Sequence, residues 1–329
     1  MSWFLGIIDF SNPNLNDLKN IHCKTNILHS DTQSNVHYEA GGIPDTCRCI
    51  KTVDSTILVL GTPIINSSLD FVSNEDLINI ITTDNFSQLT GAFSLIMITK
   101  NTIKVICDSL NLRKLYYYQG SNQLIIGTDL VWIKKMITTK IDIDALGVYW
   151  TLNQAYSNSS LYKNIKCING TFIYSLHNKT VKVSNILFTP LTTNYKKDIT
   201  LTEVVRPLEK LISNVSKKKV SLGLSGGVDS RTILAMMLHS NINFTTHTFG
   251  ESQNYDVKIA GKIAKHFNFE NVNYNKHNRL DADYLVQSIR DYTRSTEMSH
   301  SFVSIPMYDH LAALNSRNLS MIMEDLSVL

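Results

Sequence analysis

Short apolar runs separated by polar breaks dominate the first half of the chain. Runs of this length are typical of β-strands, which we predict at residues 4–10, 55–62, 91–99, 102–108, 115–118, 123–127, 172–176 and 180–183. The last six form three pairs, and a break as short as Lys100-Asn101 is typical of a β-hairpin. Consecutive hairpins indicate antiparallel sheets, and we expect these sheets to stack.

The second half has a different pattern, in which short strands alternate with helices. We predict strands at 219–224, 243–249, 272–274 and 319–323, and helices at 203–215, 229–239, 256–266, 283–292 and 306–314. Such alternation predicts a parallel sheet with helical crossovers. One further helix is predicted at 142–152, with Asp142 or Asp144 as its N-cap. The polar stretch 189–200 separates the two patterns, so we predict domains at residues 1–190 and 198–329.

Composition narrows the class of protein. The chain has 329 residues, of which 43% are hydrophobic and 18% charged, and this excludes wholesale disorder and a coiled coil. A net charge of +3 gives no argument for a nucleic-acid partner. No apolar run approaches the ~18 residues of a membrane span, and Asp9 interrupts any signal-peptide core, so we expect a cytoplasmic protein without a membrane partner. The five cysteines are expected to be free thiols.

One motif carries most of the chemistry: Ser225-Gly226-Gly227-Val228-Asp229-Ser230, between a predicted strand and a predicted helix. The first N–H groups of a helix are unpaired and attract anions, and glycines let the backbone approach a ligand closely. The motif therefore predicts a phosphate or pyrophosphate site, with Asp229 as a Mg²⁺ ligand. No lysine follows the second glycine, as it does in loops that bind the γ-phosphate of a nucleotide. The motif therefore favours adenylyl transfer, in which pyrophosphate leaves. A serine-glycine turn that only caps a helix is the alternative.

The motif resembles the SGGxDS loop of the ATP pyrophosphatase superfamily, and more narrowly of the asparagine synthetase-related family. Further elements of that family are matched by Asp108–Tyr117, Gly91-Ala-Phe93, Leu161–Ile165, Asn169-Gly170, Thr248-Phe249-Gly250 and Tyr255-Asp256. The chain departs from the family at Asn111, where the family has glycine, and at Lys114, where it has proline. Asp256 begins a predicted helix and fits a simple cap as well as an active-site role.

The resemblance implies a fold of mixed class, α/β and α+β. It implies an N-terminal Ntn-type αββα antiparallel β-sandwich, similar to class II glutamine amidotransferases. A parallel-sheet ATP pyrophosphatase domain would follow, of the Rossmann-like, adenine nucleotide alpha hydrolase-like type. It further implies that ATP binds along Leu224, Ser225, Gly226, Gly227, Val228, Asp229, Ser230 and Phe249, with Asp229 as the catalytic residue and the Mg²⁺ ligand.

The implied reaction activates a small-molecule or peptide carboxylate as an acyl-adenylate. Ammonia or a substrate amine then forms the amide, and an asparagine-like product results if the acceptor is ammonia. No nucleic-acid partner is implied, and a homodimer is left open. Three alternatives remain: a pseudo-enzyme that retains nucleotide binding, a homologue that closes lactam or lasso-peptide rings, and an RNA-modifying ATP pyrophosphatase.

The N-terminal site departs from the family in three places. Ser2 occupies the position of the nucleophilic cysteine, since Gly6 aligns with the family's glycine without a gap. The family's Asn-Gly-Glu segment falls near Leu60-Gly61-Thr62, where the asparagine and the glutamate are absent. Loss of one oxyanion donor typically costs a factor of ~100 to 1,000 in rate. We therefore expect a glutaminase fold that no longer hydrolyses glutamine.

The end of the sequence also differs from the family. After the strand predicted at 319–323 the family has a glycine-containing loop and a long helical region, whereas Glu324 and Asp325 follow here and the sequence ends at Leu329. We therefore expect a C-terminally truncated or interrupted synthetase domain.

Overall fold

A computed structural model describes residues 2–9, 27–33, 35–42, 44–152, 159–184, 200–215, 220–274, 283, 286 and 320–322. These residues divide into two compact units, one up to residue 64 and from 72 to 184, the other comprising 65–71 and the described residues from 200 onward. The helix predicted at 283–292 is described only at Asp283 and Val286, and the one predicted at 306–314 lies outside the described residues.

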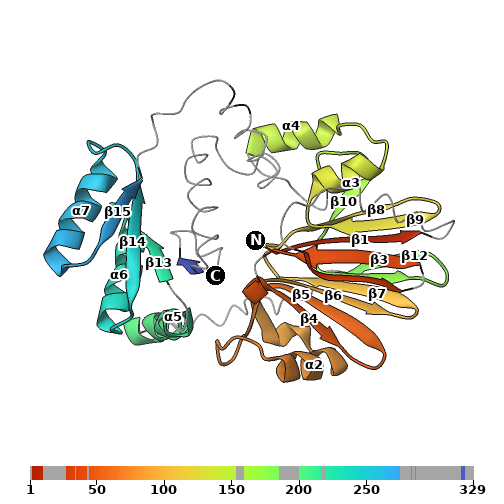
Figure 1. Cartoon of the computed structure of the whole chain (residues 1–329), viewed down its shortest axis with the longest axis horizontal. Coiled ribbons are helices and arrows are strands. Elements are labelled where there is room, and N and C mark those ends of the chain that lie inside the picture. The colour runs from red at the N-terminus through yellow and green to blue at the C-terminus, as the bar shows by residue number, and fades with distance from the viewer. Residues whose placement is uncertain are drawn as a thin grey trace. The chain divides into compact units, whose positions relative to one another are not determined.

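The first unit contains two six-stranded sheets (Figure 1). The first sheet has the order β10-β8-β9-β1-β3-β2, with strands Ile165–Ile168, Leu115–Gln119, Gln123–Gly127, Trp3–Asp9, Val36–Gly41 and Ile27–Gln33. The second has the order β12-β11-β7-β6-β5-β4, with strands Thr180–Ser184, Thr171–Ser175, Thr102–Cys107, Leu89–Thr99, Ser55–Ile65 and Cys47–Lys51. Neighbouring strands pair antiparallel, including the three predicted hairpins.

The sheets of the first unit stack on one apolar core, as predicted. Phe4 and Tyr38 of the first sheet share a buried cluster with Leu58, Ile96 and Phe172 of the second. Successive residues of a strand point to opposite faces, and the outward-facing residues of β1 form a second cluster with helix α3 (Leu130–Met136). Figure 1 shows α3 and α4 (Ile143–Leu152) beyond the first sheet and α2 (Asn74–Thr82) beyond the second. The unit therefore has helix, sheet, sheet and helix layers.

The second unit is built on a parallel sheet, again as predicted. The order is β15-β14-β13-β16, with strands Asn271–Tyr274, Phe244–Phe249, Val220–Gly223 and Ser320–Ile322, and each neighbouring pair is parallel. Helices α5 (Leu201–Val215), α6 (Val228–His239) and α7 (Tyr255–Phe267) supply Ile212, Ile233 and Ala260 to the core that covers Leu222 of β13. This alternation places the predicted phosphate loop between β13 and α6.

Several elements of the first unit were not predicted: β2, β3, β4, β10, α2 and α3. The sequence of β2, ILHSDTQ, carries little apolar periodicity because this strand lies at the edge of its sheet. Helix α2 does carry a recognisable start, since Ser73 and Asp76 form a capping box. Of the two proposed caps of α4, Asp142 is the one whose carboxylate accepts from the backbone N–H groups of Asp144 and Ala145, at 3.2 and 3.3 Å.

Candidate functional site

The loop Ser225–Gly227 follows the carboxyl end of β13, a strand with neighbours on both sides in the parallel sheet. Helix α6 begins directly after it, with Gly227 as an N-cap that provides no side-chain hydrogen bond. The first N–H groups of α6 therefore have no side-chain acceptor, and the positive end of the helix dipole faces the loop. This is the geometry of an anion site at a helix N-terminus.

Ser225 and Ser230 brace the loop internally. Their hydroxyl oxygens lie 3.0 Å apart, the backbone N–H of Ser225 donates to Ser230 Oγ at 3.2 Å, and that of Gly227 donates to Ser225 Oγ at 3.0 Å. Ser230 is fully buried. Both residues were predicted to bind phosphate through their hydroxyl groups, and the structure adds a local reason for them, since each serine holds the loop in shape.

Asp256 connects α7 to the loop, a contact that the sequence left undecided. Its Oδ1 accepts from the backbone N–H of Gly226 at 2.8 Å, whereas the N-cap of α7 is Asn254. A Cβ at position 226 would lie only 2.7 Å from the same Oδ1. The loop therefore needs glycine here for close approach, and Asp256 acts across the loop as well as at its own helix.

Asp229, the predicted Mg²⁺ ligand, lies exposed in the first turn of α6 and makes no hydrogen bond or ion pair with the described residues. No group of three or more metal-ligating side chains occurs in the described part of the chain. Glu324 and Asp325 lie outside that part. Mg²⁺ commonly takes one or two carboxylates together with phosphate oxygens and water, so a single exposed aspartate beside a phosphate loop fits this ion.

The two residues predicted beside adenine are arranged differently from one another. Leu224 is buried, its N–H donates to the carbonyl of His247 at 2.8 Å, and its carbonyl accepts from the Thr248 hydroxyl at 2.8 Å. Its main-chain groups are thus already engaged within the sheet. Phe249 ends β14, where its ring lies 5.9 Å from that of Tyr274. An aromatic surface at Phe249 is the more accessible of the two predicted contacts.

The predicted parts of the N-terminal site also come together, within the first unit. Ser2 is buried, and the Arg113 guanidinium donates to its Oγ. Gly61 has a φ of +85°, and a Cβ there would lie 3.1 Å from Arg113 Nε and 2.2 Å from the carbonyl oxygen of Ala92. Ser2 and the Leu60–Thr62 segment therefore both lie at Arg113, a meeting point that the sequence did not indicate.

Asp108 holds the turn that presents Arg113. Its carboxylate is buried and accepts from the backbone N–H groups of Leu110, Leu112 and Arg113 at 3.1, 2.9 and 2.9 Å. Asn111 within this turn has a φ of +53°, a left-handed conformation that asparagine tolerates better than most residues. The replacement of the family's glycine by Asn111 is therefore compatible with the same turn.

A buried cation, Arg113, dominates the electrostatics around Ser2. Burial lowers the pKa of the Arg113 guanidinium, and the nearby Asp108 carboxylate opposes this shift, so the side chain stays a cation. A guanidinium can donate to Ser2 but cannot accept its proton, and no imidazole or carboxylate of the described residues hydrogen-bonds to Ser2. Cys47 lies close enough to Arg113 to interact electrostatically, a neighbour that the sequence did not indicate, and burial raises its thiol pKa to about 11. A raised pKa keeps the Cys47 thiol protonated, so this neighbour is no ready nucleophile.

A comparison with known protein families finds one match, which lies in the second half of the chain. Residues 212–325 match the family model described as asparagine synthase. No curated protein matches the chain. This part of the chain, which includes the whole loop from Ser225 to Ser230, is thus similar to asparagine synthases.

Two solved structures are weakly similar. Glutamine phosphoribosylpyrophosphate amidotransferase from B. subtilis, complexed with ADP and GMP, is 10% identical with a TM-score of 0.32, and the match covers 74% of this chain and 65% of that one. A structure described as the allosteric regulatory enzyme of purine biosynthesis is 11% identical with a TM-score of 0.30, covering 98% and 74%. Likeness at these scores supports no conclusion about this chain, which spans 65% of the first structure's length.

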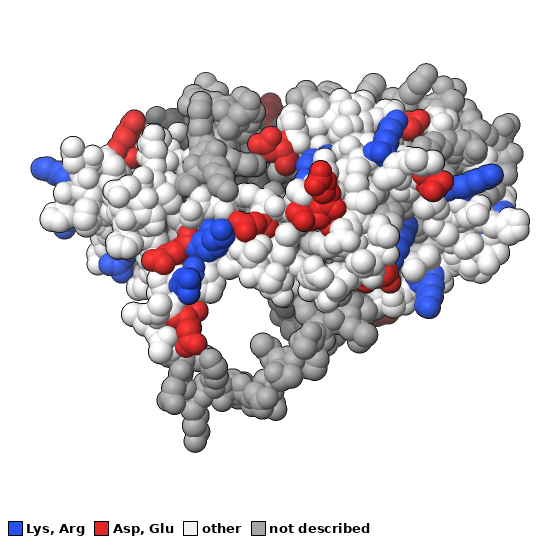
Figure 2. Space-filling model, turned by 90° about the horizontal axis from the view of Figure 1, so that it is seen from below, with Lys and Arg blue, Asp and Glu red and all other residues white. Residues whose placement is uncertain are grey.

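The surface adds two observations. On the face seen in Figure 2, basic and acidic side chains of the described residues are interspersed, without a large area of one sign. A nucleic-acid partner would favour a clustered basic area, so this face gives no support to the RNA-modifying alternative. None of the helices in the described ranges is long and apolar enough to cross a membrane.

Proposed function

We propose that the chain is an ATP-dependent amide-forming ligase of the asparagine synthase type. The observation that carries the proposal is the glycine loop Ser225–Gly227 between parallel strand β13 and helix α6, in the segment that matches asparagine synthases. A carboxylate oxygen attacks the α-phosphorus of ATP, and the bond to pyrophosphate breaks. The nitrogen of ammonia or an amine then attacks the acyl carbon, AMP leaves, and the nitrogen loses a proton.

The loop supports this reaction because it can hold the leaving pyrophosphate. The uncapped N–H groups at the start of α6 offer donors, and a helix N-terminus carries roughly half a positive charge. Gly226 lacks a Cβ where one would collide with Asp256, so the loop can pack closely against the start of α7 and keep its shape. Asp229 would supply the protein carboxylate for Mg²⁺, which would neutralise charge on the departing pyrophosphate.

The nitrogen donor follows from the N-terminal site. We propose that the first unit does not hydrolyse glutamine, because the Ser2 hydroxyl is bound by a guanidinium and has no base among its described partners. The amine is then free ammonia or a group on a second substrate. Which carboxylate is activated stays open, and small molecules and peptides are both candidates.

A protein that binds nucleotide without ligating is the second candidate. It is favoured by the setting of Asp229, which belongs to no group of three or more metal-ligating side chains within the described ranges. The two candidates agree on nucleotide binding and differ on chemistry, so they can be separated by one assay.

The test measures ATP binding and pyrophosphate release by the full chain. Calorimetry with ATP and Mg²⁺ should give saturable binding, and a panel of amino-acid and peptide carboxylates should include one that releases pyrophosphate. Hydroxylamine should then trap the acyl-adenylate as a hydroxamate. Binding without pyrophosphate release from any carboxylate selects the second candidate, and no binding of ATP, AMP or pyrophosphate overturns both.

Two matched variants locate the activity. Asp229→Asn should remove the Mg²⁺-dependent part of ATP use. Asp144→Asn should have no effect, because Asp144 is likewise an exposed aspartate in the first turn of a helix but belongs to the first unit. Unchanged turnover in Asp229→Asn would contradict the role given to this residue.

A further inference from the structure

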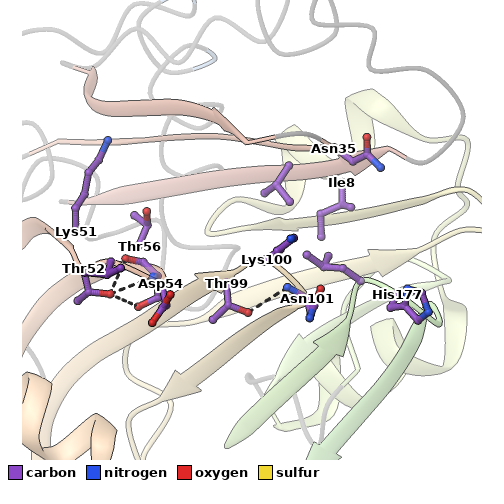
Figure 3. Close-up of a pocket in the computed structure, with 14 residues that line it drawn as sticks. Ile8, Asn35, Lys51, Thr52, Asp54, Thr56, Thr99, Lys100, Asn101 and His177 are labelled. Carbon is purple, nitrogen blue, oxygen red and sulfur yellow. Dashed lines mark hydrogen bonds between the residues drawn. The ribbon is translucent and has the colours of Figure 1, made fainter.

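A cavity of about 710 Å³ lies in the first unit, away from both predicted sites. It is lined by Ile8 near the end of β1 and by residues of four hairpin turns, those joining β2 to β3, β4 to β5, β6 to β7 and β11 to β12 (Figure 3). Strand β1 begins beside Ser2, and a strand rises ~3.3 Å per residue, which puts Ile8 roughly 20 Å from Ser2. The cavity is therefore separate from the Ser2–Arg113 site.

The floor of the cavity is apolar and preformed. Ile8 and Val36 pair across β1 and β3, are 2% and 5% exposed, and belong to the core between the two sheets. The cavity thus opens onto one end of the sandwich core. Small-molecule sites typically occupy ~300–1,000 Å³ and combine an apolar lining with a few placed polar groups, and this cavity falls within that range.

Three of the four ionisable side chains that line the cavity are exposed and come from different hairpin turns: Asp54, Lys100 and His177. None of the three has a hydrogen bond or ion pair from its side chain to another residue that the structure describes. Lys51, which also lines the cavity, is by contrast paired with Asp31 at 3.2 Å. Figure 3 shows the Lys100 amine in the middle of the group, with Asp54 toward one end and His177 at the other.

This arrangement separates an anion-binding end from an end that accepts hydrogen bonds. Lys100 and His177 can both donate to an anion, and two such donors suit a phosphate better than a single neutral group would. Asp54 carries only acceptors and suits hydroxyl groups. The apolar floor between them suits a carbon skeleton.

We propose that this cavity binds a phosphate monoester of a sugar. The phosphate lies toward Lys100 and His177, the sugar hydroxyls toward Asp54, and the carbon skeleton over Ile8 and Val36. A cavity of about 710 Å³ has room for a sugar phosphate or a nucleoside monophosphate, which share this chemistry. The proposal concerns the first unit alone and does not depend on ligase activity.

The first experiment measures protection of individual lysines in the full chain. Amines are acetylated briefly with and without ribose 5-phosphate, and labelling is read by mass spectrometry. Saturating ribose 5-phosphate should reduce labelling of Lys100 at least threefold and leave Lys135, an exposed lysine at the end of α3, unchanged. Ribose without phosphate should protect much less. Labelling of Lys100 that ribose 5-phosphate does not change overturns the proposal.

The second experiment measures affinity in variants. Lys100→Gln and Asp54→Asn should each weaken ribose 5-phosphate binding about tenfold, a usual consequence of losing one charge-assisted hydrogen bond. Lys135→Gln is the matched control and should bind as the parent does. AMP serves as the second arm, and tighter binding than ribose 5-phosphate at this cavity would identify a nucleotide as the ligand. Equal protection of Lys100 by inorganic phosphate would overturn the sugar part of the proposal, and an unchanged affinity in Lys100→Gln would overturn the whole.

Discussion

At the scale of single residues, the contact between Asp256 and Gly226 supports the loop most directly. The hydrogen bond of 2.8 Å joins a carboxylate at the start of α7 to a backbone N–H of the loop before α6. Hydrogen bonds to charged groups contribute about 1.5–3 kcal/mol. The same carboxylate also lies near the predicted site of a pyrophosphate, whose charge it would oppose.

Substitution at position 256 measures how much the Asp256 carboxylate stabilises the loop, and distinguishes its hydrogen bond from its charge. Asp256→Ala should lower the free energy of unfolding of the second unit by about 2 kcal/mol, because the Gly226 N–H loses its acceptor. Asp256→Asn retains an oxygen at the Oδ1 position and should cost less than half of that. Urea denaturation followed by circular dichroism measures both values. An equal loss in the two variants would show that the charge, not the hydrogen bond, holds the loop.

Ser2 offers a second test at this scale. Ser2→Cys should not give measurable release of glutamate from glutamine, since the Asn and Glu of the family's segment are still absent. The parent chain is the control, and glutamate is followed by a coupled dehydrogenase. Hydrolysis well above the parent's rate would mean that Leu60–Thr62 supplies the missing groups in another way.

At the scale of elements, two glycines with opposite surroundings make a matched pair. Gly61 lies in β5 with a φ of +85° and no room for a Cβ, whereas Gly147 lies in helix α4, where an added Cβ would meet no atom within 4 Å. Gly61→Ala should therefore destabilise the first unit by more than about 2 kcal/mol, through strain and collision. Gly147→Ala should stabilise it by about 0.5–1 kcal/mol, because alanine favours a helix over glycine.

Thermal unfolding measures both glycine variants against the parent chain. The midpoint should fall for Gly61→Ala and rise for Gly147→Ala. A Gly61→Ala chain as stable as the parent would contradict the close approach of β5 to Ala92 and, with it, the position assigned to Arg113.

The observed strands and helices also show which elements could be predicted from the sequence. Buried strands with continuous apolar runs, such as β5, β6 and β7, were predictable because burial on both faces leaves a hydrophobic pattern. Edge strands β2 and β4 were missed because polar residues such as Asp31 and Arg48 break that pattern, and the central strand β3 was missed as well. The alternation of strands and helices in the second half of the chain predicted the parallel sheet, because parallel strands are joined by helices that cover the faces of the sheet.

Site residues divide in a similar way. The loop from Ser225 to Ser230 was predictable, because its glycines and its place between strand and helix are local features. The contact of Asp256 with Gly226 joins residues 30 positions apart and depends on how α7 packs. The lining of the cavity near Lys100 and His177 depends on four turns meeting at one end of two stacked sheets. Local sequence patterns do not reveal such contacts between residues that are far apart in the chain.

At the scale of the whole molecule, the two units have separate cores, and one proposed ligand site falls in each. The first unit buries the Phe4–Phe172 cluster and holds the cavity near Lys100, whereas the second buries Leu222 and holds the phosphate loop. A ligand that binds only the folded state adds RT ln(1 + [L]/Kd) to stability, which is about 2.7 kcal/mol at a hundredfold excess over Kd. Each ligand should therefore stabilise one unit.

Scanning calorimetry of the full chain tests this division. ATP with Mg²⁺ should raise the unfolding midpoint of one transition, ribose 5-phosphate should raise that of the other, and the two ligands together should raise both without further gain. Asp229→Asn should reduce only the effect of ATP, and Lys100→Gln only that of ribose 5-phosphate. If instead the chain unfolded in a single transition that either ligand raised, the two units would unfold as one cooperative body.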